Sequence, residues 1–275
     1  MNAILSDTSH QERHFEAYIV QQLAARGWLV GQSSGYDQNH ALYPEDLVEW
    51  IKSTEPKKWD KLVAGNGEKA TATLMARLEQ ALEKDGTVQI LRNGFKIAGA
   101  GEISLSEGLP EDERDPSAWE RYKANRLRVV PQLHYRPGST LAIDLAFFIN
   151  GLPVATVEIK TDFTQSADAA VEQYKNDRLP KDAATGRIEP LLTFKRGAVV
   201  HFAMSDSDIR MATKLAGPDT YFLPFNMGLD GHAGNPLRTD GEYPVAYFWE
   251  QVCAPGNWLR IFHSFVYTEK KDVVD

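Results

Sequence analysis

The sequence lacks the features that mark secreted and membrane proteins. It has one cysteine, Cys253, among 275 residues, which excludes a disulfide framework and a multi-cysteine zinc site. Its N-terminus has no basic stretch followed by an apolar run, so it does not resemble a secretory signal peptide. No stretch approaches the roughly 18 uninterrupted apolar residues of a membrane-spanning helix. We therefore expect a cytoplasmic protein that makes no membrane contact.

Positive charge is also scarce. The chain has 30 lysines and arginines against 38 aspartates and glutamates, which gives a formal net charge of −8. A freestanding, high-affinity DNA-binding domain is usually basic, so the balance argues against one. A module whose DNA is held by another domain or subunit stays open. The phosphate-binding pattern G-x-x-x-x-G-K-[ST] is absent as well, because the nearest text, residues 65–71, has the wrong spacing. We expect no ATP site in this chain.

The composition that is present suits one folded unit. The chain is 43% hydrophobic and 25% charged, and a chain of this length can bury a sizeable core without disulfides or metals. We assign residues 1–265 to a single domain. The polar end, residues 266–275, is interpreted as a linker stub.

The hydrophobic pattern predicts helices and strands in alternation. Helical spacing is found at residues 11–26, 43–56, 68–84 and 168–177, and in a C-terminal segment that carries Trp249 and Trp258. Two Asn-Gly pairs, at 93–94 and 150–151, predict β-hairpins. Residues 198–204 predict a buried strand, and residues 217–245 an irregular excursion. Together these elements predict an α/β domain with a mixed central β-sheet flanked by helices.

The second predicted hairpin carries three charged residues in apolar surroundings. Asp144 stands between Ile143 and Leu145, and Glu158 and Lys160 lie in the following strand. Because side chains alternate along a strand, Glu158 and Lys160 share one face. Burying charges in a strand is costly unless they are paired or bind a metal ion. The hairpin therefore predicts a functional cluster.

The register of this hairpin decides whether the carboxylates meet. If Asn150 and Gly151 alone formed a two-residue turn, Asp144 would oppose Val157 and point away from Glu158. One additional residue, in a three-residue or bulged turn, sets Asp144 directly opposite Glu158. We predict the second register.

Two converging carboxylates suit Mg²⁺, which binds a few carboxylates together with water and substrate phosphate. The ion would polarise a phosphoryl oxygen and acidify a bound water. Lys160 would orient that water or neutralise charge in the transition state. The alternative is an ordinary buried salt bridge from Lys160 to Asp144 or Glu158.

At these positions the sequence resembles the PD-(D/E)xK nuclease superfamily, with Asp144 on one strand and Glu158-Ile159-Lys160 on the next. The wider text resembles the N-terminal domain of type I restriction enzyme motor (R) subunits. The resemblance covers nearly the whole chain and is carried by HFEAYIVQQLAARGW, FFINGLPVATVEIK, DAAVEQYKNDR, FKRGAVVHFAMS and LAGPDTYFLPFNMG.

The resemblance implies a restriction-endonuclease-like core with extra strands, and Mg²⁺-dependent hydrolysis of DNA. It implies that a glutamate of the first helix, here Glu16, joins the metal site. It also implies a Gln-x-x-x-Tyr element on the helix after Glu158. Tyr174 matches the tyrosine and is expected to act near the catalytic site, or else to pack in the core. Ala170 occupies the glutamine position, and the nearby glutamine, Gln173, is either a catalytic-site residue or a surface residue of the helix. Lys175 and Arg178 on the same segment are expected to be solvated charges.

The family also implies partners. These are double-stranded DNA, the methylation and specificity subunits of a restriction complex, and helicase-like motor domains that use ATP. Two other hypotheses remain at this point. One is a nuclease-like fold that docks the motor or grips DNA without cutting it, and the other is an unrelated α/β hydrolase.

Overall fold

The computed structural model describes residues 2–112, 114–161, 166–183, 185–229, 231–232 and 234–268. Most of the expected linker stub therefore lies outside the described residues. The helices are α1 Asn2–Ala25, α2 Pro44–Thr54, α3 Pro56–Asn66, α4 Ala70–Asp85, α5 Thr87–Asn93, α6 Pro116–Lys123, α7 Ala167–Asp177 and α8 Pro255–Arg260. Short 3-10 turns lie at Ser33–Gly35, Gly67–Lys69 and Pro190–Leu192, and π-helical turns η4 and η5 at Phe248–Val252 and Ile261–Phe265.

A seven-stranded mixed sheet forms the centre of the molecule, in the order β1-β4-β5-β6-β7-β8-β9. The β1–β4 and β6–β7 pairs are parallel and the others antiparallel. The strands are β1 Leu29–Val30, β4 Leu127–His134, β5 Ala142–Ile149, β6 Leu152–Ile159, β7 Val200–Met204, β8 Ile209–Ala212 and β9 Leu223–Pro224. The predicted mixed α/β architecture is confirmed.

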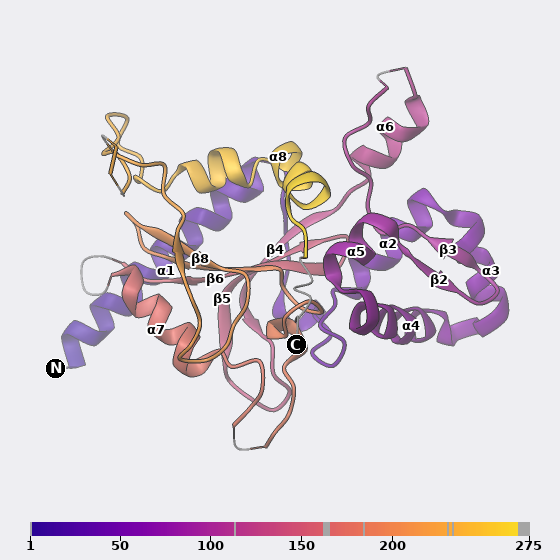
Figure 1. Ribbon diagram of the computed structural model, residues 1–275, viewed down its shortest axis with the longest axis horizontal. Coiled ribbons are helices and arrows are strands. Elements are labelled where there is room, and N and C mark those ends of the chain that lie inside the picture. The colour runs from indigo at the N-terminus through magenta and orange to yellow at the C-terminus, as the bar shows by residue number, and fades with distance from the viewer. Residues whose placement is uncertain are drawn as a thin grey trace, which may run out of the picture.

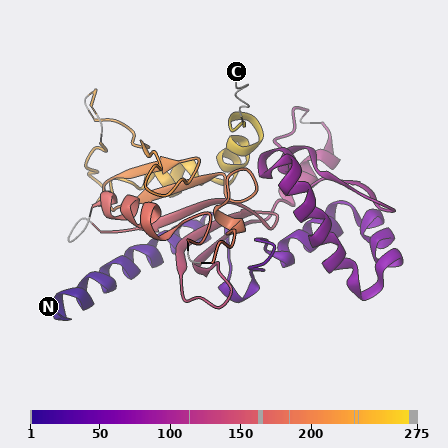
Figure 2. The ribbon, with the colours of Figure 1, turned by 60° about the horizontal axis from the view of Figure 1, so that its bottom comes forward.

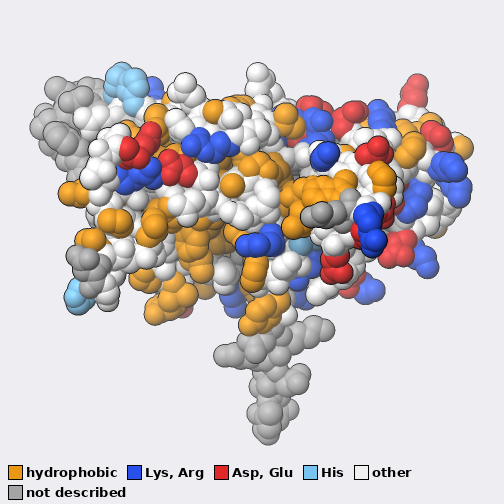
Figure 3. Space-filling model, turned by 90° about the horizontal axis from the view of Figure 1, so that it is seen from above, with side chains coloured by type: hydrophobic (Ala, Val, Ile, Leu, Met, Phe, Trp, Pro, Cys, Tyr) orange, Lys and Arg blue, Asp and Glu red, His pale blue; other side chains and the backbone are white. Residues whose placement is uncertain are grey.

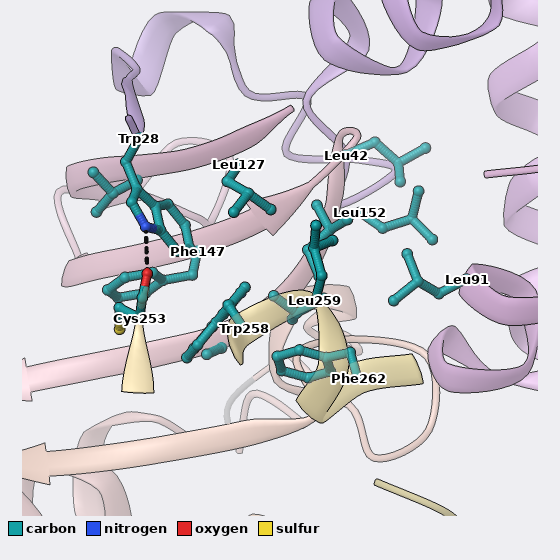
Figure 4. Packing of buried hydrophobic residues seen from close by; sticks show 14 of the residues in the cluster. Trp28, Leu42, Leu91, Leu127, Phe147, Leu152, Cys253, Trp258, Leu259 and Phe262 are labelled. Carbon is teal, nitrogen blue, oxygen red and sulfur yellow. Dashed lines mark hydrogen bonds between the residues drawn. The ribbon is translucent and has the colours of Figure 1, made fainter. Parts of the chain in front are cut away.

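Helices cover both faces of the sheet (Figure 1). The larger core joins α1 and the C-terminal helices to one face. Its aromatic centre is Trp28, Phe147 and Trp258, whose ring centroids lie 5.2 to 5.6 Å apart (Figure 4). The indole of Trp28 donates to the carbonyl of Cys253 at 2.8 Å. Helix α7 packs on the opposite face in a second core. Trp249 and Trp258 are buried, as expected.

A lobe made of α2 to α5 and a small hairpin stands beside the sheet (Figures 1 and 2). The hairpin pairs β2 Phe95–Ile97 with β3 Gly101–Ile103. The predicted hairpin turn at Asn93-Gly94 is wrong, because residues 87–93 form α5 and Gly94, at φ +69°, ends that helix. Val88, Ile90 and Leu91 are buried at helical spacing, which overrides the Asn-Gly signal.

The β5–β6 hairpin has the predicted register, reached in a different way. Its turn is a two-residue turn, since Ile149 pairs with Leu152 and Asn150 and Gly151 have φ of +48° and +86°. The additional residue is Val154, which bulges out of β6 between the pairs Phe148–Pro153 and Phe147–Ala155. The turn packs closely against the start of α2, since a Cβ on Gly151 would lie 2.5 Å from the carbonyl oxygen of Tyr43.

Two further observations concern the surface. None of the helices in the described part of the chain is long and apolar enough to cross a membrane. Acidic and basic side chains are interspersed over the end of the molecule formed by α2 to α6 (Figure 3). This mixed surface agrees with the low positive charge of the sequence.

Candidate active site

Asp144 lies where β5 and β6 separate. The paired ladder reaches Leu145 and Val157. Beyond that pair, Asp144 Oδ2 accepts a hydrogen bond from the backbone nitrogen of Ile159 at 2.7 Å. The carboxylate thus takes the position of a strand carbonyl. The same register, continued by one pair, sets Asp144 opposite Glu158 as predicted.

Gln132 of β4 connects Asp144 to Glu16 of α1. Its Nε2 atom donates to Glu16 Oε2 at 2.5 Å and to Asp144 Oδ1 at 3.1 Å. The three side chains border a hollow of about 630 Å³. Its lining residues are Glu12, Arg13, Glu16, Gln132, Asp144 and Ile159. The predicted meeting of Glu16 and Asp144 is therefore present, and Gln132 is a site residue that the sequence did not reveal.

Lys160 reaches the same region from the end of β6. Its Nζ lies 3.6 Å from Glu12 Oε2 on α1, and both side chains are largely shielded from solvent. The alternative interpretation paired Lys160 with Asp144 or Glu158, and the structure gives it a different partner. Glu12 could have been found in the sequence, because it stands four residues before Glu16 and so shares its helix face.

Glu158 is completely buried, does not line the hollow and has an arginine partner. Arg178, which directly follows α7, donates from Nε to Glu158 Oε1 at 2.5 Å and from a terminal nitrogen to the Ala142 carbonyl at 2.7 Å. The other oxygen, Glu158 Oε2, is buried without a hydrogen-bond partner among the described residues. The expectation that Arg178 is a solvated charge is wrong, since burial of Glu158 requires a compensating cation.

The two residues expected from the family's Gln-x-x-x-Tyr element differ in their surroundings. Tyr174 is fully buried, and its hydroxyl lies 2.8 Å from Thr156 Oγ1. Thr156 Oγ1 in turn lies 2.7 Å from Nδ1 of the buried His201. Tyr174 therefore packs against β6 from the sheet face that α7 covers, and it does not reach the hollow. Gln173 is half-buried on α7.

Three glutamates of this region, Glu12, Glu16 and Glu158, have a raised pKa and hold their protons more tightly than usual. Burial, with a smaller contribution from the Asp144 charge, raises the pKa of Glu16 to about 7. Burial also raises the pKa of Glu12 and, together with Asp144, that of Glu158. Loss of contact with water is the main cause of these shifts, and the charge of Asp144 adds to it. A divalent cation bound at the hollow would favour the ionised forms of these carboxyl groups.

The donor set fits such a cation in part. Asp144 and Glu16 present carboxylate oxygens at one hollow, and Glu158 keeps one oxygen without a partner. Magnesium prefers this chemistry, with water and substrate phosphate as its remaining ligands. Among the described residues, however, no group of three or more histidine, cysteine, aspartate or glutamate side chains is already arranged around one point. The predicted convergence of Asp144, Glu158 and Glu16 is thus reached for two of the three.

Comparison with family models relates this fold and this site to a known protein family. A family model described as the type I restriction enzyme R protein N terminus matches residues 10–220. The chain belongs to this family. The family is the nuclease domain of type I restriction enzyme R subunits and has a PD-(D/E)xK-type fold, so the mixed sheet of this R-subunit domain is a restriction-endonuclease-like core. Comparison with curated proteins found no match.

The matched range contains every site residue of the R-subunit domain described above, from Glu12 on α1 to His201 on β7. It ends before the C-terminal helices, whose tryptophans complete the core under α1.

Proposed function

We propose that this domain is the DNA-cutting endonuclease of a type I restriction enzyme R subunit and hydrolyses phosphodiester bonds with Mg²⁺. The observation that supports the proposal best is the cluster at the β5–β6 opening. Asp144, Glu16 and Glu12 line one hollow there, and Lys160 lies next to it through its pair with Glu12. Glu158 is buried in the strand directly before the lining residue Ile159.

In this proposal, Asp144 and Glu16 would hold the ion from the hollow. Glu158 would hold it through Oε2, the oxygen that has no hydrogen-bond partner among the described residues. When bound, the ion polarises the phosphoryl oxygen and acidifies a water molecule. Lys160 donates to the attacking water or to the phosphate and stabilises charge in the transition state. The water oxygen gives one proton to solvent as it forms a bond to phosphorus. The bond from phosphorus to the leaving oxygen breaks, and that oxygen takes a proton from solvent, so one water molecule is consumed for each bond cut. Tyr174 acts as a support of β6, and Gln173, which is half-buried, faces outward enough to touch DNA.

The acidic charge of the chain assigns DNA capture to other parts of the complex. We propose that the specificity and methylation subunits recognise and hold the DNA. Translocation with ATP would belong to helicase-like motor domains of the R subunit, since the sequence has no phosphate-binding loop of the expected pattern.

The test uses the complete restriction enzyme, reconstituted with R subunits that carry Asp144→Asn or Lys160→Ala. Each variant should lower Mg²⁺-dependent cleavage by at least about 100-fold, the usual effect of removing an electrostatic catalytic group. ATP hydrolysis, translocation and assembly should stay near those of the unmodified enzyme. Lys175→Ala is a matched control, because Lys175 lies on α7 and pairs only loosely with Glu172, at 3.8 Å.

The competing proposal is a nuclease-like module that docks the motor or grips DNA without catalysis. It requires that the same variants reduce assembly or translocation, with cleavage falling only in proportion. Cleavage equal to that of the unmodified enzyme in both variants would refute the catalytic assignment.

A further inference from the structure

Gln132 has a backbone conformation that is unusual for a strand residue. Its φ is +47°, in the left-handed region, although it lies inside β4. The β4–β5 ladder pairs Pro131 with Leu145 and Leu133 with Ile143, and it omits the pair between Gln132 and Asp144. A non-glycine residue in this conformation costs about 1 kcal/mol or more. Such strain is usually retained where it positions a side chain for function.

The strain turns the Gln132 amide toward two carboxylates. Glu16 and Asp144 come from different elements, α1 and β5, and a single nitrogen, Gln132 Nε2, donates to both. That nitrogen is the only positive end of the Gln132 side chain, and it lies between two negative groups where a cation would also be attracted. A glutamine amide offers a donor on one side and an acceptor oxygen on the other. Rotation of the amide by half a turn would present Oε1 in place of Nε2.

We propose that Gln132 is a switchable ligand of the cation site. Without the cation its amide nitrogen bridges Glu16 and Asp144, and with the cation its amide turns and Oε1 becomes a neutral oxygen ligand. The ligand class is a hard divalent cation, Mg²⁺ or Mn²⁺, which binds amide oxygens as well as carboxylates. The inference rests on the proposed function, since it assumes that a cation binds at this hollow.

The test measures Mn²⁺ binding to the 275-residue chain. Two methods report it: titration calorimetry, and the electron paramagnetic resonance signal of free Mn²⁺. Gln132→Gly removes the side chain and suits the positive φ, so backbone strain cannot confuse the result. It should weaken binding about 10-fold. Gln132→Glu supplies a charged oxygen ligand that cannot donate and should strengthen binding about 10-fold. Circular dichroism checks that each variant is folded.

Gln38→Ala is the matched control, because Gln38 Nε2 donates to the His134 carbonyl at 2.8 Å and touches no carboxylate of the site. It should bind Mn²⁺ as the unmodified chain does. Mn²⁺ binding by Gln132→Gly that equals or exceeds that of the unmodified chain would overturn the inference. The amide would then either have no effect on the cation or only compete with it for Glu16 and Asp144.

Failure of the proposed function has a different signature. If neither the unmodified chain nor Asp144→Ala binds Mn²⁺, the cation itself is refuted, and the switch with it. If the unmodified chain binds and Asp144→Ala does not, while Gln132→Gly binds normally, only the role of Gln132 is wrong. A crystal soaked with Mn²⁺ adds a direct check, because the inference requires Gln132 Oε1 within about 2.3 Å of the ion.

Discussion

The two carboxylates of the β5–β6 hairpin have opposite surroundings. Glu158 is completely buried and its charge is matched by Arg178 at 2.5 Å. Asp144 borders an open hollow and faces another carboxylate, Glu16, with only the Gln132 amide between them. We refer to the Glu158 surroundings as the buried side and to the Asp144 surroundings as the open side.

The difference separates charge that the fold has neutralised from charge left available. On the buried side every ionised group needs an internal partner, because an unpaired charge there is costly. On the open side Asp144 and Glu16 are only partly buried and border the hollow, so a cation can reach them. Substitutions on the buried side should therefore change stability first, although Glu158 would also contribute Oε2 to the ion in the proposed function. Substitutions on the open side should change cation binding and cleavage at nearly constant stability.

The largest expected effect on stability is that of Arg178→Met. Removing the guanidinium leaves the Glu158 carboxylate buried without compensation, which should lower the free energy of unfolding by about 3–5 kcal/mol. Urea denaturation measures the loss. The double variant Arg178→Met with Glu158→Met should recover most of it, because neither charge is then left unpaired. A double variant as unstable as the single one would show that Arg178 stabilises the fold by packing and not by its charge.

The next largest expected effect is a loss of stability at acidic pH, caused by a histidine of the buried side. Burial lowers the pKa of His201 from 6.5 to about 3. The unfolded chain therefore takes up this proton first, so the contribution of neutral His201 is complete above about pH 6.5 and is lost as the pH falls toward 3. The full shift corresponds to about 5 kcal/mol, of which about 3 kcal/mol is lost between pH 7 and pH 4. Stability measured from pH 7 to pH 4 should fall less steeply in His201→Asn, and parallel curves would contradict the assignment.

Tyr174→Phe should have a smaller effect on the same side. The variant removes one buried hydroxyl that lies 2.8 Å from Thr156 Oγ1, and such a loss costs about 1 kcal/mol. The rate of cleavage by the assembled enzyme should stay close to that of the unmodified enzyme, since Tyr174 does not reach the hollow. A drop in cleavage of more than about tenfold in a stable variant would place Tyr174 at the DNA instead.

Glu16→Gln should have the smallest effect on stability. Glu16 is half-buried at the hollow, so the free energy of unfolding should change by no more than about 0.5 kcal/mol. Its Mn²⁺ affinity should nevertheless fall severalfold, because one of the facing carboxylates is gone. Calorimetry measures the change in Mn²⁺ affinity, and urea denaturation of the same preparation measures the change in stability. A large stability loss with unchanged Mn²⁺ affinity would place Glu16 in the fold and not in the site.

Much of the site could be predicted because it depends on local pattern. Asp144, Glu158 and Lys160 stand out in the sequence as charged residues in apolar strands. The requirement that the two carboxylates lie opposite each other predicted the register of the hairpin. Arg178 and Gln132 could not be found this way. Arg178 lies 20 residues after Glu158, and Gln132 lies 116 residues after Glu16. Only the packing of α7 and α1 around the sheet brings these pairs together.

The sequence by itself determined the class of fold, the family and the hairpin that carries the chemistry, because alternation and charge placement are properties of neighbouring residues. The tertiary structure decided where the additional residue goes. The turn at Asn150 and Gly151 packs closely against Tyr43, and the additional residue lies at Val154, beside Pro153, which has no amide hydrogen to give to the ladder. It also decided which carboxylate is neutralised and which is left open, since burial and partners are set by elements far apart in the chain.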